Sequence, residues 1–309
     1  ENSTGVTTVT SSDVDGGTPV YSISGGADAA KFAINSGSGE LTFVSAPDFE
    51  TPTDAGADNV YDVTVEVSDG TLTDSQAIAV TVTSANDNAP TITSNGAGAT
   101  AAVNVAENLT AVTTVTATDA DLPGETLTYS ISGGADAAKF AINSSTGALT
   151  FAVAPDFETP TDGGADNVYD VTVEVSDGSL TDSQAIAVTV TSVNDNAPTI
   201  TSNGAGATAA VSIEENQTAV TTVVAADADL PAQTLTYTIT GGADAAKFDI
   251  VSGTGALSFV SAPDFETPTD VGTDNVYEVT VQVSDGALTD SQDISVTVID
   301  IGNTIVVTT

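Results

Sequence analysis

Hydrophobic and polar residues alternate along most of this chain, in short runs that turn residues separate. The run Val60–Val67 places Tyr61, Val63, Val65 and Val67 on one face and Asp62, Thr64 and Glu66 on the other. A period of two residues is that of a β-strand with one buried face. Turn pairs such as Asp69-Gly70 end these runs at short, regular intervals, which is typical of an all-β sandwich.

The same series of runs returns twice, with a period of 108 residues. In the first repeat we expect strands at Val20–Ile23, Leu41–Val44, Val60–Val67 and Ala77–Val82, and a single helical turn between Ala27 and Phe32. Each repeat is long enough to bury a core of its own. The predicted domains are residues 1–88, 89–196 and 197–303, followed by a β-prone C-terminal tail, 304–309.

Repeats two and three open with a segment that repeat one does not have. These leading segments, residues 90–106 and 198–214, contain Asn95-Gly96 and Asn203-Gly204, which predict a tight turn between two short β runs. Repeat one starts at Glu1-Asn2, the counterpart of Glu107-Asn108. We therefore expect a segment of a longer protein, whose first sandwich lacks an edge strand.

The tail 304–309 stands where the leading segment of a fourth repeat would start. An extended peptide can complete a sandwich that has an open edge, so this tail predicts head-to-tail assembly by strand donation. Such a contact does not close on itself and would build a fibre. The alternative is that the two ends are simply where this sequence stops.

The charge of the chain is strongly one-sided. Forty-three acidic residues stand against three lysines, with no arginine or histidine, which gives a formal net charge of −40. Such a surface repels nucleic acid and anionic lipid, so cations are the expected partners. A hydrophobic content of 40% is too high for a disordered acidic tail.

Composition also removes several kinds of chemistry. Without cysteine there is no disulfide, thiol catalysis or zinc–thiolate site, and without histidine most acid–base catalysis is missing. No run of 18 apolar residues occurs, so we expect no membrane insertion. The lysines Lys31, Lys139 and Lys247 each stand in Gly-Gly-Ala-Asp-Ala-Ala-Lys-Phe, where a local ion pair or packing of the stem on the phenylalanine is expected rather than a catalytic dyad.

A short acidic sequence joins the repeats. Asn86-Asp87-Asn88-Ala89-Pro90 returns unchanged as Asn194-Asp195-Asn196-Ala197-Pro198, each time between two β runs. Proline fixes its φ, and carboxylate and amide oxygens are ligands that Ca²⁺ prefers. We interpret this linker as a hinge that calcium locks.

Five motifs in the same order at both linkers resemble those of the cadherin repeat, and the resemblance covers nearly the whole chain. In that family the calcium ligands between domains come from a Glu in a PEN-like element, an acidic DRE-like pair, a DxNDN linker, a DxD element of the next domain and a later Asp. The resemblance implies three tandem cadherin-like Greek-key β-sandwiches in a linear rod. It also implies about three Ca²⁺ ions at each inter-domain junction.

Carried over residue by residue, the resemblance implies two ligand sets. The first junction would use Glu1, Asp48, Glu50, Asn86, Asp87, the Asn88 carbonyl, Asp119, Asp121 and Asp177. The second would use Glu107, Asp156, Glu158, Asn194, Asp195, the Asn196 carbonyl, Asp227, Asp229 and Asp285. Each set brings seven carboxylates together, so an empty junction should splay through charge repulsion.

The chain departs from the family pattern in three places, one of which is the loop after Asp121, residues 122–125, where the family's usual Gly/Asn pattern is missing. Ser84 and Ser192 stand where the linker motif has its first Asp, which predicts one weaker ion site. After repeat three, Asn303 stands where Asp87 and Asp195 stand, so we expect this last junction to be degenerate.

Other interpretations of the same residues remain. Most of the acidic residues are expected to be solvated surface charge. Asp48-Phe49-Glu50 could be a carboxylate pair for glycoside hydrolysis, but three near-identical tandem copies argue against a catalytic cleft. Tyr61, Tyr169 and Tyr277 are expected in the cores.

We therefore expect a non-enzymatic, extracellular or cell-surface protein, part of a bacterial adhesin or surface filament of the kind found in biofilms. Its expected partners are calcium and either further copies of itself or other cell-surface proteins. The alternative is a carbohydrate-binding module array of a polysaccharide-degrading system, with polysaccharide as the partner.

Overall fold

The structure is a computed structural model that describes residues 1–121 and 124–302. It is all-β, as predicted, with one 3-10 turn in each repeat. By its internal contacts the chain divides into two compact units. The first comprises Glu1–Val103, Ala111–Ala152 and Tyr169–Val188, and the second comprises Asn104–Thr110, Val153–Val168 and Thr189–Thr309. Each unit contains one of the two linkers with the acidic residues on both sides of it.

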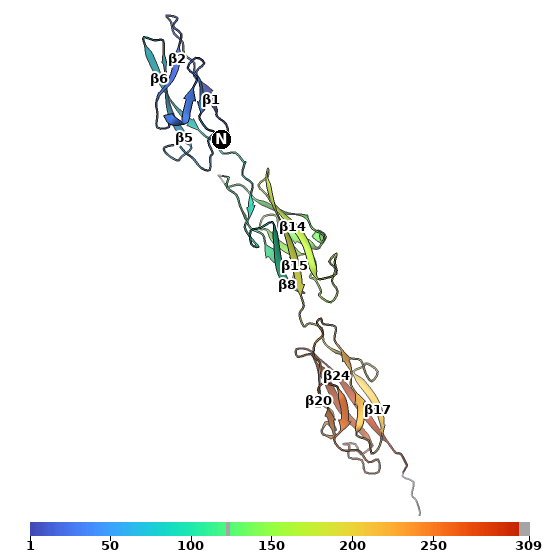
Figure 1. Cartoon of the computed structure of the whole chain (residues 1–309). Helices are drawn as coiled ribbons and strands as arrows, with labels where there is room; N and C mark the ends of the chain where they lie inside the picture. Colours follow the sequence, from blue (N-terminus) through green and yellow to red (C-terminus); the bar gives the residue numbers. More distant parts are fainter. Residues whose placement is uncertain (122–123, 303–309) are drawn as a thin grey trace, which may run out of the picture. The chain divides into compact units, whose positions relative to one another are not determined.

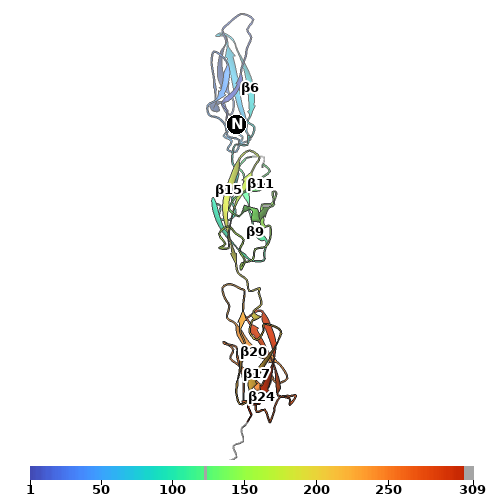
Figure 2. The same cartoon turned by 90° about the vertical axis from the view of Figure 1, so that its right-hand side faces the viewer.

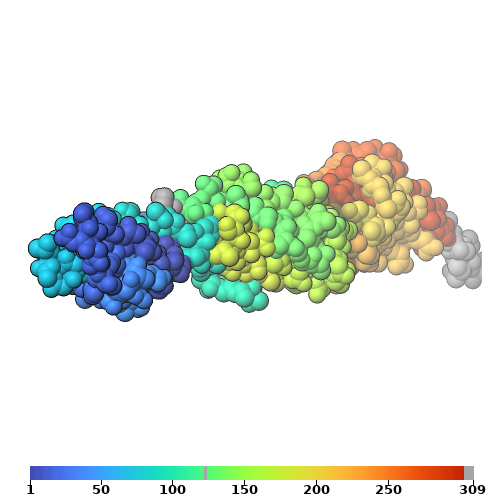
Figure 3. All heavy atoms as spheres, turned by 90° about the horizontal axis from the view of Figure 1, so that it is seen from above, coloured from blue at the N-terminus to red at the C-terminus, as the bar shows by residue number. Residues whose placement is uncertain are grey.

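Repeat one lies in the first unit and forms two sheets of three strands. One has the order β1-β4-β3 and the other β2-β5-β6. The alternating run predicted at Val60–Val67 is β5, which pairs antiparallel with β6 over its full length. The elements are β1 (Gly5–Thr8), β2 (Val20–Gly25), η1 (Ala29–Lys31), β3 (Phe32–Ile34), β4 (Glu40–Phe43), β5 (Val60–Ser68) and β6 (Thr73–Thr81), and η1 is the predicted helical turn. The atoms of repeat one are the blue and cyan spheres of Figure 3.

Repeat two has the same two sheets and an additional strand pair. The sheets have the orders β12-β13-β9, β11-β14-β15-β8 and β10-β7, and β14, β15 and β8 are labelled in Figure 1. The elements are β7 (Thr91–Ile92), β8 (Thr100–Ala106), β9 (Ala111–Thr114), β10 (Ala117–Thr118), β11 (Thr128–Gly133), η2 (Ala137–Lys139), β12 (Phe140–Ile142), β13 (Ala148–Phe151), β14 (Val168–Ser176) and β15 (Thr181–Thr191).

Repeat three lies in the second unit and repeats this arrangement. Its sheets have the orders β18-β22-β21, β17-β24-β23-β20 and β16-β19, and β20, β17 and β24 are labelled in Figure 2. The elements are β16 (Thr199–Ile200), β17 (Thr208–Glu214), β18 (Ala219–Thr222), β19 (Ala225–Ala226), β20 (Thr236–Gly241), η3 (Ala245–Lys247), β21 (Phe248–Ile250), β22 (Ala256–Phe259), β23 (Val276–Ser284) and β24 (Thr289–Ile299).

Aromatic residues form the centre of each core. In repeat three Phe248 and Phe259 stack at 4.4 Å between ring centroids, and the Tyr277 ring meets Phe259 edge-on at 5.0 Å. Tyr61, Tyr169 and Tyr277 are each 1% exposed, as expected for core residues. Apolar residues on the inner faces of the strands complete the cores, which hold the strand ends and linkers in place.

The turn predicted at Asn95-Gly96 is present, with φ of 53° and 90°. Its two flanking strands do not form a hairpin, because β7 pairs with β10 whereas β8 lies beside β15. The leading segment therefore contributes one strand to the two-stranded sheet and one to the four-stranded sheet of its repeat. The predicted tail 304–309 and Asn303 lie outside the described residues.

Candidate metal centre

A glutamate fastens the linker to the acidic turn of its own repeat. At the first linker, the Glu1 carboxylate accepts the N–H of Phe49 at 2.7 Å and the N–H of Ala85 at 2.6 Å. At the second, Glu107 accepts the N–H of Phe157 at 2.7 Å and that of Val193 at 2.6 Å, and it is 2% exposed. The glutamate of the PEN-like element therefore sets the position of the linker chain.

The acidic pair forms a turn that Asp48 closes. Its Oδ1 accepts the N–H groups of Glu50 and Thr51, both at 3.0 Å. Hydrogen bonds from the Thr51 side chain and backbone lower the pKa of Asp48. Asp156 makes the same two bonds, to Glu158 and Thr159. These bonds use one carboxylate oxygen of each aspartate.

The linker is bonded to the acidic turn of the next repeat. The Asn88 side chain donates to Asp121 at 2.7 Å and to Asp87 at 3.0 Å, and the Asp121 N–H donates to Asp119 at 3.1 Å. The Asn2 side chain donates to Asp87 from the upstream side. Asp87 is thus held by Asn2 of repeat one and by Asn88 of the linker, and Asn88 in turn is bonded to Asp121 of repeat two.

The last predicted ligand comes from the loop after the long alternating strand. Asp177 accepts the N–H groups of Ser179 and Leu180, both at 2.7 Å. The Leu180 amide is the largest cause of the lowered pKa of Asp177, and the Asn86 side chain also donates to it. A residue 58 positions beyond Asp119 in the sequence is therefore brought to the linker by the fold.

At the first linker the seven predicted carboxylates gather in three overlapping triads. In each triad the oxygen atoms lie within 4.8 Å of one another. The first and second triads share Glu50, and the second and third share Asp121. The triads are Glu1, Asp48 and Glu50; Glu50, Asp87 and Asp121; and Asp119, Asp121 and Asp177.

The second linker repeats this geometry. Glu107, Asp156 and Glu158 form one triad, and Glu158, Asp195 and Asp229 form the next. Asn196 donates to Asp229 at 2.8 Å and to Asp195 at 3.0 Å, and the Asp229 N–H donates to Asp227 at 3.1 Å.

Crowding of negative charge at the second linker is visible in the pKa of Glu158. Burial raises the pKa of Glu158, and the neighbouring carboxylates Glu107 and Asp229 raise it further, against a hydrogen bond from the Leu230 N–H at 3.0 Å. Glu158 belongs to both triads named for this linker. A positive charge between these groups would remove the repulsion.

A divalent oxygen-seeking cation fits both clusters. Several side-chain oxygens are buried without any hydrogen-bond partner, namely Asn86 Oδ1, Asp119 Oδ2 and Asp177 Oδ2 at the first linker and Asn194 Oδ1, Asp227 Oδ2 and Asp285 Oδ2 at the second. Asp121 and Asp229 are 2% and 1% exposed. Buried charges need a counter-charge, and the chain has only three lysines. A set of ligand atoms that consists of carboxylate and amide oxygens, with no nitrogen or sulfur donor, suits Ca²⁺.

Some participants were not among the predicted site residues. Asn108 donates to Asp195, as Asn2 does to Asp87. The Asn86 side chain also donates to Glu125 at 2.9 Å and the Asn194 side chain to Gln233 at 2.6 Å. Glu125 and Gln233 stand 108 residues apart, so the repeat period is the signal that could have found them. The assignment of the Asn88 and Asn196 carbonyls as ligands stays a prediction.

The end of repeat three keeps only part of this arrangement in the described residues. Glu215 accepts the N–H of Phe265 at 3.1 Å and that of Ile301 at 3.4 Å. The predicted degeneracy concerns Asn303, which lies outside the part of the chain that the structure describes.

Tandem β-sandwiches with shared acidic clusters at their linkers define a class of calcium-dependent repeat proteins. The Cadherin domain profile matches residues 101–193 and 209–299, and this chain belongs to the cadherin family. Cadherin domains are typically extracellular, calcium-dependent adhesive or structural domains. Their homologues are adhesion proteins rather than enzymes and occur in ectodomains at the cell surface.

Individual relatives agree with this placement. The chain is 32% identical to human Protocadherin Fat 1 over 90% of its length and 33% identical to mouse Cadherin EGF LAG seven-pass G-type receptor 2 over 94%. It spans 6% and 10% of the length of these two proteins.

Among solved structures, the mouse Cadherin-23 EC22-24 fragment has a TM-score of 0.61 at 24% identity, with 96% of this chain and 92% of that one covered. The human CDH23 EC21-23 fragment has a TM-score of 0.63 at 20% identity, with 96% and 95% covered. These similarities show the fold. No helix among the described residues is long and apolar enough to span a bilayer.

Proposed function

We propose that this chain is an extracellular structural and adhesive protein whose linkers are made rigid by calcium. The observation that carries the proposal is the set of overlapping carboxylate triads at each linker, together with buried oxygens that lack any partner. A cation held by oxygens from both sides of a linker restricts the hinge. Without the cation, the same carboxylates repel one another.

The three triads of the first linker support three ion positions. Glu50 and Asp121 would each bridge two ions, as the only members that belong to two of these triads. Three Ca²⁺ ions bring six positive charges to seven carboxylates and leave a net charge of about −1. We assign the corresponding residues of the second linker the same roles. Asn86, Asn88, Asn194 and Asn196 would complete the coordination with neutral oxygens.

We further propose that the chain belongs to an adhesin or surface filament of a bacterium. Near-identical tandem repeats and the absence of cysteine support an extended protein that needs neither disulfides nor sequence diversity. Its partners would be further copies or other cell-surface proteins. One solved relative is a Protocadherin gammaB7 EC3-6 cis-dimer, an assembly of two copies.

The carbohydrate-binding alternative finds no support in the surface. Sugar rings usually stack on exposed aromatic side chains. All tyrosines and phenylalanines of the chain lie within the described residues, and each is buried or half-buried. We therefore do not propose polysaccharide as a partner.

Head-to-tail assembly by strand donation remains part of the proposal. It requires an acceptor and a donor. Within the described residues, β6 is the outer strand of its sheet and its residues are exposed or half-buried, which is the position that the proposed acceptor would occupy. The tail 304–309, predicted as the donor, lies outside the described residues.

Bead aggregation tests the adhesive function. Beads coated with the chain should aggregate in millimolar calcium and disperse in chelator. Asp121→Asn combined with Asp229→Asn should abolish aggregation, because both residues are shared or buried members of the clusters. The control pair Asp62→Asn and Asp170→Asn removes the same charge from exposed strand positions and should aggregate normally. Aggregation to the same extent in calcium and in chelator would refute the proposal.

A further inference from the structure

Each repeat has an asparagine in the left-handed backbone conformation directly before its long alternating strand. Asn59, Asn167 and Asn275 have φ of 64°, 64° and 61° and precede β5, β14 and β23. This conformation is uncommon for residues other than glycine, and asparagine tolerates it better than most. None of the three belongs to the predicted ligand sets.

Asn59 joins three separate segments of repeat one. Its side-chain amide donates to the Phe49 carbonyl at 2.9 Å, and its backbone N–H donates to the Asp54 carboxylate at 3.2 Å. Its own carbonyl accepts the N–H of Val82 at 2.9 Å. One residue therefore ties the acidic turn to the loop that follows it and to the strand end that leads into the linker.

Repeats two and three contain the same three bonds. Asn167 donates to the Phe157 carbonyl at 2.9 Å, and Asn275 donates to the Phe265 carbonyl at 3.0 Å. Their backbone bonds, to the loop aspartate and from the last strand, have the lengths found in repeat one, 3.2 Å and 2.9 Å. Asn59 and Asn167 are each 9% exposed, so their bonds are shielded from water.

The bond from Asn59 fixes the backbone between two predicted ligands. Phe49 stands between Asp48 and Glu50. Both of these belong to one triad with Glu1. The Phe49 N–H is bonded to Glu1 at 2.7 Å, and the Phe49 carbonyl is bonded to Asn59 at 2.9 Å. Glu1 thus fixes the peptide group before Phe49, and Asn59 fixes the peptide group after it. Without Asn59 this second group is free to rotate, which would move Glu50 away from the triad.

The oxygen of the same amide makes no bond. The Oδ1 atoms of Asn59, Asn167 and Asn275 are buried without a hydrogen-bond partner in the part of the chain that the structure describes. Burying such an oxygen costs free energy, so the side chain stabilises the turn through its donor alone. Asparagine combines this donor with tolerance of a left-handed backbone. Aspartate lacks the donor, and glycine lacks the side chain.

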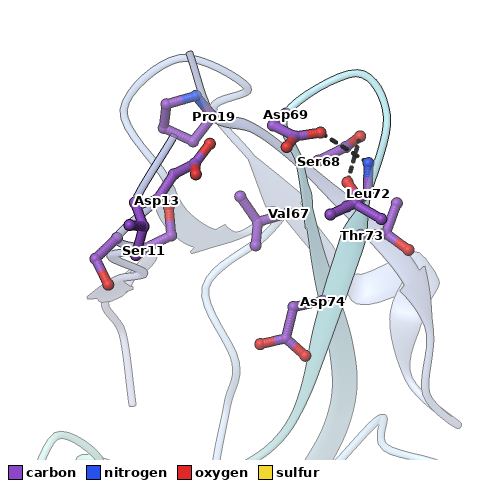
Figure 4. A pocket seen from close by; sticks show the side chains of 11 residues that line it. Ser11, Asp13, Pro19, Val67, Ser68, Asp69, Leu72, Thr73 and Asp74 are labelled. Atoms are coloured by element: carbon purple, nitrogen blue, oxygen red, sulfur yellow. Dashed lines mark hydrogen bonds between the residues drawn. The ribbon is translucent and has the colours of Figure 1, made fainter. Parts of the chain in front are cut away.

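The far end of the long strand is closed by a different side chain. Asp69 follows β5, and its Oδ1 accepts the N–H of Leu72 at 2.7 Å (Figure 4). Its counterpart in repeat two is Asp177, which belongs to a triad of the first linker. Asn167, before the other end of β14, is bonded to the acidic turn of the second linker. A change at Asn167 should therefore leave the first linker unaltered.

We propose that Asn59 and Asn167 are positioning residues for the calcium sites of the first and the second linker. Each orients the acidic turn of its own repeat through the carbonyl of the central phenylalanine, and neither contacts the ion. The inference rests on the calcium binding of the proposed function. It assigns a role to residues that carry no charge.

Glycine substitutions test this role, because glycine keeps the left-handed backbone and removes only the side-chain bond. In isothermal titration calorimetry, Asn167→Gly should lower the calcium affinity of the second linker about three- to tenfold, the effect of losing one hydrogen bond. Asn59→Gly should do the same at the first linker. Asn275→Gly is the matched control. It removes the same bond in repeat three, whose acidic turn belongs to neither ligand set, and should bind calcium as the unaltered chain does.

Hydrogen exchange read by mass spectrometry locates each effect. In calcium, exchange should become faster at 156–159 and 191–195 in Asn167→Gly, and at 48–51 and 83–87 in Asn59→Gly. In chelator, all three variants should lose similar stability in urea, because the lost bond is the same. A purely structural role would give this loss of stability without any change in calcium affinity.

Two results would overturn the proposal. One is an unchanged calcium affinity of Asn59→Gly and Asn167→Gly in chains that their urea curves show to be folded. The other is an equal loss of affinity in Asn275→Gly, which would make the effect a general loss of stability. Failure of the calcium proposal looks different, because the unaltered chain would then bind no calcium. In that case, faster exchange of the acidic turns in chelator would still support their orientation by the asparagines, and unchanged exchange would overturn it.

Discussion

Replacing Asp121 with asparagine should remove most of the calcium-dependent stability at the first linker. Asp121 is 2% exposed and belongs to two of the three carboxylate triads there. The substitution keeps the size of the side chain and its ability to accept from Asn88. It removes one charge from two ion positions at once, so both should bind calcium more weakly.

The magnitude follows from linkage. A ligand that binds only the folded state at one hundred times its dissociation constant adds about 2.7 kcal/mol to the free energy of unfolding per site. One kcal/mol shifts the Tm of a domain of this size by about 4–8 °C. A single saturated site therefore raises Tm by roughly 10–20 °C. Two carboxylate oxygens 4.8 Å apart repel by about 3 kcal/mol at an effective dielectric of 20. Solvent around Asp87 reduces this repulsion. The linker should still be less stable without calcium than with it.

Differential scanning calorimetry over a calcium titration measures this effect. The unaltered chain should gain 10 °C or more in the transition that includes repeat two, by the estimate of roughly 10–20 °C per saturated site. Asp121→Asn should lose most of this gain, and Asp62→Asn should keep it. A Tm that does not respond to calcium, or equal losses in both variants, would refute the assignment of the triads as ion sites.

Three further predictions concern ion number, acid stability and a backbone approach. Isothermal titration calorimetry, with native mass spectrometry as a check, should count about three calcium ions per linker; a single ion in total would contradict the shared-ligand geometry. Burial alone would raise the pKa of Asp162, but hydrogen bonds from the backbone amides of Asp166 and Asn167 outweigh it and lower this pKa below 3.8. The contribution of Asp162 to stability is therefore present above its pKa in the unfolded state and is lost as pH falls through its pKa in the folded state. The difference in unfolding free energy between the unaltered chain and Asp162→Asn, measured in urea, should hence shrink below about pH 4. A difference that grows below about pH 4 would contradict a lowered pKa of Asp162. Gly134→Ala should cost about 2 kcal/mol or more in the same urea assay, because its Cβ would clash with the Asp170 carbonyl oxygen. Gly178→Ala has the same φ of 107° but nothing within 4 Å of its Cβ, and it should cost less.

The strands and the acidic motifs could be predicted because their information is local. Tyr61 and its neighbours alternate with a period of two, and the repeat period marks which acids recur. The helical turn at Ala29–Lys31 was equally readable from the glycines and small residues before it.

The pairing of the leading segment could not be read in the same way. Asn95-Gly96 has the sequence of a hairpin turn, yet its flanking strands join different sheets. The choice between those partners depends on Asp182 and Gln184, which lie nearly 90 positions away. Likewise, Asn2 and Glu125 can be recognised as part of the linker cluster only from their hydrogen bonds with Asp87 and Asn86.

The sequence by itself determined that this protein is a tandem array of β-sandwiches with clusters of acidic and amide residues at its linkers. Composition, periodicity and motif order are properties of the chain, and no contact is needed to read them. Only the tertiary structure decided which surfaces those strands cover. Thr73–Thr83 and Thr181–Thr191 have the same residues, but within the described residues only the second has a further strand, β8, at its outer edge. Burial depends on what packs against a segment, and that neighbour comes from a distant part of the chain.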